Sequence, residues 1–144
     1  MHPPLLYLSG VVIGAVVNGM KPLPVSHSSF VRIIGLVVVI LGIIWTNWGR
    51  LAMKAHGTNI NPTKPTTTIV RSGPYRLSRN PLYLGLTIVY LGLSLAVNSW
   101  WCLLLLIPIS LLMHFQVVLL EERYLDRKFG ETYREYQRRV RRYL

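Results

Sequence analysis

The apolar residues of the chain fall into four long blocks that are separated by shorter polar segments. The blocks cover residues 5–20, 31–48, 82–97 and 100–120. Because a membrane-spanning helix needs about 20 apolar residues, with about 17 at the lower limit, the second and fourth blocks qualify directly, and flanking residues can lengthen the other two. None of the blocks contains Lys, Asp or Glu, and Arg32, at the edge of the second block, is their only Arg. The pattern predicts an all-α protein that crosses a membrane about four times.

Local signals set the expected ends of these helices. We expect the second helix to end near Gly49 and to be followed by a polar linker over residues 57–68, whose Pro, Asn and Thr content argues against a helix. Asn80 and Pro81 suit the cap and the first position of the third helix. A tight turn at residues 98–99 then joins the third and fourth helices into a hairpin.

The segment after the fourth block holds all five acidic residues of the chain. A helix that stopped at Glu121 and Glu122 would place two carboxylates at its negative end, so we expect it to continue to Phe129, with Gly130 as its cap. A second helix should then begin near Glu131. Its aromatic and apolar stripe has a 4-3-4-3 spacing over Phe129, Tyr133, Tyr136, Val140 and Tyr143. With the arginines largely off this stripe, the pattern predicts an amphipathic helix in the membrane interface, its basic face toward lipid headgroups.

The charge distribution sets the predicted orientation in the membrane. The chain has 16 Lys and Arg against 5 acidic residues. Six of the basic residues lie in residues 50–79 and eight in residues 123–142, whereas the turn at 98–99 has none. The positive-inside rule therefore places the central loop, the C-terminus and, with four spans, the N-terminus in the cytoplasm. The basic residues flank apolar spans instead of covering a soluble face, which argues against a nucleic-acid-binding protein.

The composition disfavours two further features. Cys102 is the only cysteine and the four histidines are scattered, so we expect no disulfide and no metal site. The first block has no Lys or Arg before it and no small-residue cleavage site after it. We therefore expect a span there and not a cleaved signal peptide.

The first stretch with candidate chemistry covers residues 71–85 and follows the polar linker. It combines three cations, a Gly-Pro turn, a helix start, two aromatic rings and a glycine that permits close approach. The free N–H groups at the helix start attract anions. A positively charged loop with an ordinary helix cap and interfacial tyrosines would have the same composition. The residues concerned are Arg71, Gly73, Pro74, Tyr75, Arg76, Arg79, Asn80, Pro81, Tyr83 and Gly85.

The second stretch covers residues 121–136 and begins with two adjacent glutamates. Neighbours on a helix point about 100° apart, so Glu121 and Glu122 suit the binding of a cation or a sugar diol better than paired acid–base catalysis. Ion pairs with nearby basic residues in a purely structural helix are the alternative. His114 shares the expected helix face with Glu121, whereas Gln116 lies on a different face.

Together these stretches resemble the two signatures of the isoprenylcysteine carboxyl methyltransferase and phospholipid methyltransferase superfamily. The first signature reads approximately G-P-Y-R-x-x-R-H-P-x-Y-x-G, and residues 73–85 read GPYRLSRNPLYLG. The second reads E-E-x-x-L-x-x-x-F-G-x-x-Y-x-x-Y, and residues 121–136 read EERYLDRKFGETYREY. The resemblance covers residues 59–140, with a helical hairpin between the signatures. It departs at Asn80, where the carboxyl methyltransferases have His, and at Gln116, near which they carry an Arg for the substrate carboxylate.

The resemblance implies a methyltransferase that uses S-adenosylmethionine as its methyl donor. Arg79 and the helix N-terminus at Asn80 would hold the carboxylate of the donor, and Glu121 or Glu122 would hold its amino group or ribose diol. Tyrosine rings would pack on the adenine or the sulfonium. The implied donor-binding residues are Gly73, Tyr75, Arg79, Asn80, Pro81, Tyr83, Gly85, Glu121, Glu122, Tyr133 and Tyr136. The implied catalytic residues are His114, Gln116, Glu121 and Glu122, and no metal is expected.

The two departures bear on the methyl acceptor. Without the Arg and the His, we expect a lipid-like or small hydrophobic acceptor that enters from the bilayer, in place of a prenylcysteine. Two alternatives stay open at this point: an isoprenylcysteine-type carboxyl methyltransferase, and a non-catalytic membrane scaffold or lipid-binding protein. In each case the expected partners are membrane lipids and not nucleic acid.

Overall fold

The computed structural model describes residues 2–59 and 66–144 of the chain. Residues 60–65, in the middle of the predicted polar linker, lie outside the described residues. Every regular element in the described ranges is helical, and the elements follow one another as α1 (Pro3–Met20), α2 (Phe30–Ala55), the 3₁₀ turn η1 (Gly73–Arg76), α3 (Pro81–Ala96), α4 (Trp100–Met113), the π-helical turn η2 (His114–Val118), α5 (Leu119–Phe129) and α6 (Glu131–Arg139).

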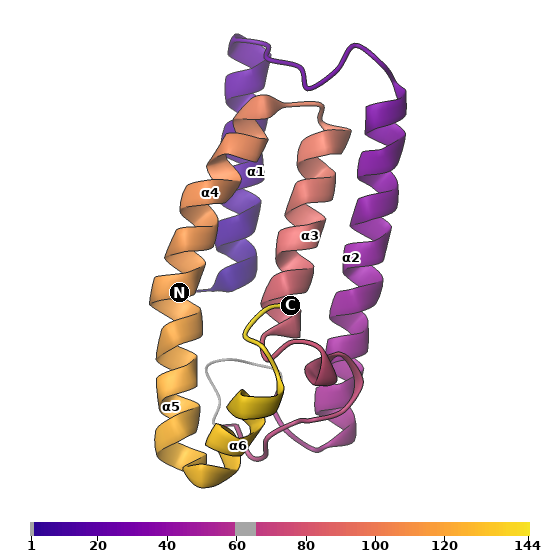
Figure 1. Ribbon diagram of the computed structural model, residues 1–144. Coiled ribbons are helices and arrows are strands. Elements are labelled where there is room, and N and C mark those ends of the chain that lie inside the picture. Colours follow the sequence, from indigo (N-terminus) through magenta and orange to yellow (C-terminus); the bar gives the residue numbers. More distant parts are fainter. Residues whose placement is uncertain (1, 60–65) are drawn as a thin grey trace.

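Four apolar helices lie side by side and form the body of the molecule (Figure 1). Three of the described helices are long and apolar enough to cross a membrane: α1, α2, and the continuous helix Trp100–Phe129 that α4, η2 and α5 form together. The fourth, α3, has 16 residues and is shorter. The predicted all-α membrane protein is thereby confirmed.

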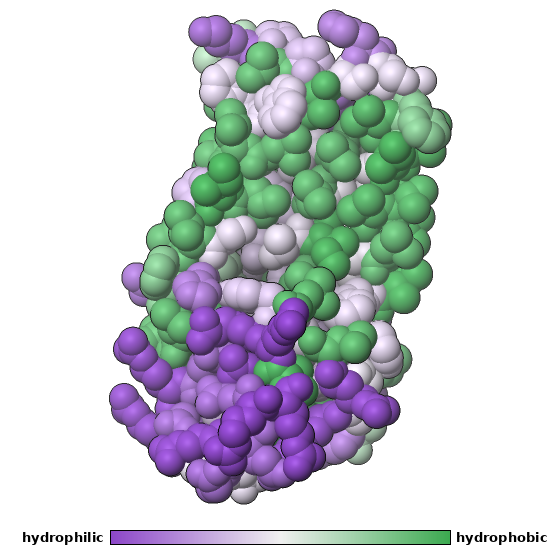
Figure 2. Space-filling view, viewed as in Figure 1, coloured by the Kyte–Doolittle hydropathy of each residue, from purple (hydrophilic) through white to green (hydrophobic). Residues whose placement is uncertain are grey.

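The surface around these helices is apolar over most of its height. Only 11% of the most apolar part of α2 is buried inside the protein, so its outer side chains need lipid as their surroundings. Figure 2 shows this apolar band above one strongly polar end, to which α5, α6 and the C-terminal residues contribute. The polar chemistry of the chain is therefore concentrated at one end of the helical bundle.

The second helix is longer than the sequence predicted. We expected it to end near Gly49, but α2 continues to Ala55. Gly49 is buried, and a Cβ atom built on it would lie 2.9 Å from Leu82 Cδ2 of α3. The prediction was wrong because this glycine serves close helix packing, which offsets its low helix propensity.

The contact between α2 and α3 depends on small residues at the points of closest approach. A Cβ atom on Gly35 would lie 2.4 Å from the backbone nitrogen of Ala96, and one on Gly92 would lie 2.6 Å from the backbone nitrogen of Val39. In a membrane, where apolar surface gains little from leaving lipid, such close backbone packing is a main source of helix association. The glycines thus fix α3, and with it the site at its N-terminus, against α2.

On its other side, α3 packs against α1 and α4 through a small core. Tyr7, Tyr90, Ile109 and Met113 form this core, and each is at most 6% exposed. The Tyr90 hydroxyl donates to the Cys102 carbonyl oxygen at 2.9 Å, and the Tyr7 hydroxyl lies 2.7 Å from Thr87 Oγ1. The buried hydroxyls are therefore paired, as an apolar environment requires. The predicted hairpin turn is also present, with Asn98 at φ 56° and Ser99 as the cap of α4.

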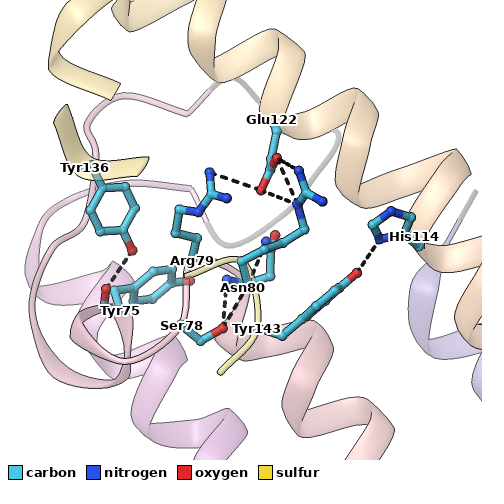
Figure 3. Close-up of polar contacts among 9 residues, drawn as sticks. Tyr75, Ser78, Arg79, Asn80, His114, Glu122, Tyr136 and Tyr143 are labelled. Carbon is cyan, nitrogen blue, oxygen red and sulfur yellow. Dashed lines mark hydrogen bonds and ion pairs between the residues drawn. The ribbon is translucent and has the colours of Figure 1, made fainter. Parts of the chain in front are cut away.

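The end of the chain folds differently from the expected amphipathic helix. As predicted, α5 ends at Phe129, Gly130 caps it with φ 53°, and α6 begins at Glu131. However, α6 ends at Arg139, and Val140 is already extended. We name residues 140–144 the C-terminal strap, because they run back from α6 toward the N-terminus of α3 and toward His114 (Figures 1 and 3). The helical stripe predicted through Val140 and Tyr143 is wrong beyond Tyr136.

The helix that carries the glutamates contains one turn that the sequence pattern did not predict. From Ile109 onward its buried residues are Ile109, Met113, Val118 and Glu122, which are spaced four, five and four positions apart. The spacing of five falls across η2, where the backbone is π-helical. A π-turn inserts one extra residue into an α-helix, so it shifts the inward face by one position. Glu122 therefore continues the buried stripe, and the expectation that Glu121 shares a helical face with His114 is wrong.

Candidate active site

Both sequence stretches with candidate chemistry meet at the polar end of the bundle. The loop that leads into α3, the start of α5, helix α6 and the C-terminal strap converge there (Figure 3). Most of the sequence-predicted residues lie in this cluster, whereas Gln116 and Gly85 lie outside it. The contacts within the cluster, described next, fall into an ionic centre, a tyrosine group and an adjacent apolar cavity.

Glu122 is the centre of the ionic group. Its carboxylate accepts three hydrogen bonds from Arg142 of the C-terminal strap, at 3.0, 3.1 and 3.2 Å. Arg79 Nη1 lies 3.3 Å from Glu122 Oε1 on the other side. The Glu122 side chain is 8% exposed and that of Arg79 is 10% exposed, whereas Arg142 is 37% exposed. A buried carboxylate requires this degree of pairing, and Glu122 has a guanidinium group on each side.

Arg79 has hydrogen-bonding capacity to spare. Its Nη1 is close enough to Glu122 for Coulombic attraction, but the geometry does not make a hydrogen bond, and Nε and Nη1 are buried without an acceptor among residues 2–59 and 66–144. Buried N–H donors are nearly always paired in folded proteins, and an exception calls for an explanation. A buried guanidinium N–H that lacks an acceptor suits an anion such as a carboxylate, because a hydrogen bond from a charged donor to a charged acceptor is strong. The position beside Arg79 Nε is therefore a candidate anion site.

Glu121 faces a different set of partners. The Tyr83 hydroxyl donates to Glu121 Oε2 at 2.6 Å. Burial raises the pKa of the Tyr75 phenol, and the nearby Glu121 carboxylate raises it further. In contrast to Glu122, no ion pair with Glu121 is found among the described residues. Its carboxylate is therefore the one left to bind a cation or a hydroxyl pair.

Tyrosine rings close the site on the side of α6. Tyr133 is 2% exposed and Tyr136 is 4% exposed, and their ring centroids lie 6.2 Å apart. The Tyr136 hydroxyl donates to the Tyr75 carbonyl oxygen at 2.6 Å (Figure 3). Burial and the Glu122 carboxylate raise the pKa of Tyr133 to about 12, although Arg79 opposes the shift. These phenols are neutral at physiological pH, so they can donate hydrogen bonds and offer ring faces but cannot act as bases.

The remaining residues of the first stretch have structural contacts. Asn80 caps α3 by its backbone position, but its side-chain Nδ2 donates to the Arg142 carbonyl oxygen at 3.2 Å. The Pro81 carbonyl oxygen accepts from Trp45 Nε1 at 2.9 Å. Gly73 opens η1 with φ 58°, a conformation that favours glycine. Gly85 faces α2, where an added Cβ would lie 2.1 Å from Thr46 Oγ1, so its close approach is to another helix.

An apolar cavity of about 540 Å³ adjoins the site between α1, α3 and α4. Its polar lining residues are Tyr7, Tyr83, Thr87, Ser110, His114 and Tyr143. Tyr83 therefore borders both the cavity and Glu121. Among the described residues that line the cavity, none is Lys or Arg. The cavity can hold an uncharged apolar group close to the glutamates, but it offers no cation for a carboxylate.

Two sequence-predicted catalytic residues belong to the π-turn and lie on different sides of the helix. His114 lines the cavity, and its Nδ1 lies 2.8 Å from the Tyr143 hydroxyl. Gln116 is exposed on the outside of the helix and does not line the cavity. Within residues 2–59 and 66–144, no three His, Cys, Asp or Glu side chains are grouped as a metal site would require.

The sequence analysis missed Arg142, Ser78 and Tyr143 as site residues. Ser78 is fully buried and its hydroxyl donates to the Arg142 carbonyl oxygen at 3.2 Å. Arg142 and Tyr143 lie six and seven residues beyond the end of the second signature, so the motif does not include them. The available signal was the excess of aromatic and basic residues at the end of the chain, which we interpreted as a lipid-facing pattern.

Comparison with known proteins identifies the family. The family model described as phospholipid methyltransferase matches residues 30–132, which include α2, η1, α3, α4, η2 and α5. No curated protein and no solved structure matches the chain. The match spans well over half of the 144 residues and contains Arg79, Glu121 and Glu122. It agrees with the resemblance seen in the sequence, and the chain therefore belongs to the phospholipid methyltransferase family of membrane enzymes.

Proposed function

We propose that this membrane methyltransferase takes its methyl group from S-adenosylmethionine and transfers it to an amine carried by a lipid-like acceptor. The observation that carries the proposal is the state of Arg79. This buried guanidinium has two nitrogen atoms without an acceptor in the described part of the chain, next to the N-terminus of α3 and to a carboxylate pair. Such an arrangement suits a ligand that carries both a carboxylate and a cation.

The residues around Arg79 fit the parts of the donor. Arg79, through its unpaired Nε–H, would bind the carboxylate of its amino acid tail. Glu121, which has no arginine partner among the described residues, would bind the amino group or the ribose diol. Tyr75, Tyr133 and Tyr136 offer neutral ring faces for the adenine or the sulfonium. Glu122 would not bind the donor directly, because its carboxylate is already paired on both sides.

When bound, S-adenosylmethionine supplies a methyl carbon that its sulfonium charge activates. The protein then has to align the acceptor and exclude water. The buried tyrosines of α6 and the C-terminal strap cover the polar side of the site. Glu121 Oε2 accepts the Tyr83 hydrogen bond, and Oε1 has two acceptor positions, one for the donor and one that would take the proton of the acceptor nitrogen.

The cavity supports an amine in preference to a carboxylate as the accepting group. A carboxylate acceptor needs a cation to orient it, and no Lys or Arg lines the cavity among the described residues. We therefore still predict an acceptor other than a carboxylate. The support for this prediction is the cavity lining and not Gln116, because Gln116 faces outward. The apolar lining between α1, α3 and α4 suits an alkyl chain that enters from the bilayer. The donor would then enter from the cytoplasm, at the polar end.

Donor binding to purified protein in detergent tests the proposal. Titration calorimetry with S-adenosylmethionine and with its demethylated product should show binding to the unmodified protein. Arg79→Lys keeps a cation against Glu122 but removes the Nε–H donor. Losing one charge-assisted hydrogen bond should weaken donor binding by about 10- to 100-fold. Arg138→Lys is the control, because Arg138 is 65% exposed and lies outside the cluster.

Glu121 provides a second test of the same site. Glu121→Gln preserves an acceptor for the Tyr83 hydroxyl but removes the charge. It should weaken donor binding by about 10-fold or more, whereas Glu131→Gln, at an exposed surface pair, should not. Absence of heat and of thermal stabilisation with either ligand would contradict the proposed donor. It would favour a non-catalytic lipid-binding protein instead.

A further inference from the structure

The C-terminal strap is attached to the site through its backbone as well as through Arg142. The backbone nitrogen of Arg79 donates to the Arg141 carbonyl oxygen at 3.0 Å. The Ser78 hydroxyl and Asn80 Nδ2 both donate to the Arg142 carbonyl oxygen at 3.2 Å. Three consecutive residues of the loop before α3 therefore bind two consecutive carbonyl groups of the strap. These hydrogen bonds hold the strap in a fixed position in the site, and this position determines where Tyr143 lies.

The next residue, Tyr143, projects to the apolar cavity and contacts His114 there. The Tyr143 hydroxyl and His114 Nδ1 are 2.8 Å apart, and the two ring centroids are 6.0 Å apart (Figure 3). Both side chains line the cavity. Adjacent strap residues thus serve two neighbouring regions, because Arg142 pairs with Glu122 and Tyr143 pairs with the histidine.

The Tyr143–His114 hydrogen bond has a preferred direction. A phenol O–H is a far stronger proton donor than a neutral imidazole N–H, and burial raises the pKa of the Tyr143 phenol, which keeps its proton in place. Tyr143 therefore donates and His114 Nδ1 accepts. In a neutral imidazole the proton must then be on Nε2. His114 becomes a hydrogen-bond donor through Nε2 and is not a base through that atom.

We propose that Tyr143 is a positioning residue that fixes His114 as a hydrogen-bond donor for an oxygen of the methyl acceptor, next to the accepting nitrogen. This inference rests on the proposed function and assigns the strap to the acceptor site as well as to the donor site. It also divides the work between the two predicted catalytic regions. Glu121 takes the proton, and His114 orients the headgroup. An amine-headed phospholipid carries such oxygens close to its nitrogen.

The tautomer of His114 can be measured without any turnover. Long-range ¹⁵N–¹H NMR of ¹⁵N-histidine-labelled protein in micelles distinguishes Nε2–H from Nδ1–H imidazoles, and His114→Gln identifies the signal of His114 among those of the four histidines. We expect the Nε2–H form in the unmodified protein and a mixture of tautomers in Tyr143→Phe. Tyr124→Phe is the matched control, because Tyr124 is 41% exposed and, among the described residues, its hydroxyl bonds only Lys128. An Nδ1–H form in the unmodified protein, or no change in Tyr143→Phe, would overturn the proposal.

Kinetics with phosphatidylethanolamine in mixed micelles test the acceptor role. Tyr143→Phe should raise the KM for this lipid about 5- to 10-fold and leave the donor affinity unchanged. His114→Gln, which keeps an N–H donor, should retain more activity than His114→Ala. An unchanged lipid KM in Tyr143→Phe, or equal losses in the two His114 variants, would refute the positioning role. If the unmodified protein neither binds the donor nor methylates the lipid, the proposed function is what fails, and the NMR result still decides the Tyr143–His114 geometry.

Discussion

Replacement of Glu122 by Gln should destabilise the protein strongly, because this residue is the shared partner of two arginines in a buried site. The side chain of Glu122 is 8% exposed and that of Arg79 is 10% exposed. Removing one member of a buried ion pair typically costs about 3–5 kcal/mol, since the other charge is left without compensation. Arg142 is 37% exposed and can be hydrated, so its share is discounted. We therefore expect a loss of about 3 kcal/mol, near the lower end of that range.

The chain contains its own control for this experiment. Glu135 also pairs with two arginines, with Arg139 Nη2 at 2.6 Å and Arg71 Nη1 at 3.7 Å, but its side chain is 42% exposed. An exposed pair contributes about 1 kcal/mol or less. At about 3 °C per kcal/mol for a chain of this size, Glu122→Gln should lower the melting temperature by about 9 °C. Glu135→Gln should lower it by less than about 3 °C.

The assay can use the single cysteine. Cys102 is fully buried between α1 and α3, so a maleimide dye that fluoresces on reaction reports unfolding during a thermal ramp. Arg142→Gln should fall between the other two variants, because Arg79 still faces Glu122 after that change. Equal melting temperatures for Glu122→Gln and Glu135→Gln would show that burial does not set the strength of these pairs. The distinction drawn between Glu122 and Glu121 would then lose its basis.

Three further predictions concern packing, pH and orientation. Gly85→Ala should lower the melting temperature by an amount corresponding to about 1–3 kcal/mol, because its Cβ would lie 2.1 Å from Thr46 Oγ1, whereas Gly19→Ala, with open space around it, should not. The pKa of Tyr133 is raised from 10.0 to about 12, so its contribution to stability is present below pH 10 and is lost as the pH rises toward 12. Circular dichroism should show that the helical signal declines less steeply over this pH range in Tyr133→Phe than in the unmodified protein. Identical pH profiles would contradict the argument that burial raises this pKa. In a Cys102→Ala background, a cysteine in place of the exposed Leu144 should react with an impermeant maleimide only from the cytoplasmic side. A cysteine in place of the exposed Leu23 should react only from the other side. The reverse labelling pattern would overturn the orientation that the positive-inside rule assigns.

The sequence was sufficient to predict the helical framework because block length and hydrophobicity are local properties. The helix starts at Pro81 and Glu131 and the end at Phe129 follow from caps and fixed dihedral angles. The continuation of α2 past Gly49 could not be predicted, since it depends on how closely Leu82 approaches from another helix. A glycine that ends a helix and one that admits a neighbour look the same in a single sequence.

The sequence predicted many residues of the candidate site but not which of them pair with one another. Arg79 and the two glutamates were identified from the signatures, and the structure brings them together. Their division into a paired Glu122 and an available Glu121 was not predictable, because it is set by Arg142, 20 residues from Glu122. Tyr143 matched a helical stripe by spacing, but the loop before α3 binds the Arg141 and Arg142 carbonyl groups and holds this segment outside the helix. Hydrogen bonds between backbone groups that are far apart in the sequence do not affect the local spacing of apolar residues, so this spacing cannot predict them.

The π-turn at His114–Val118 divides one helix into two segments that have different surroundings. Deleting one residue within it would turn the spacing of five between Met113 and Val118 into the regular spacing of four, and Glu122 would stay in the inward stripe. If these five residues instead became α-helical with no change in length, Glu121 would move into the inward stripe and Glu122 would move out of it, away from Arg79. The backbone conformation of five residues therefore determines which glutamate is buried against arginine and which one lies beside Tyr83.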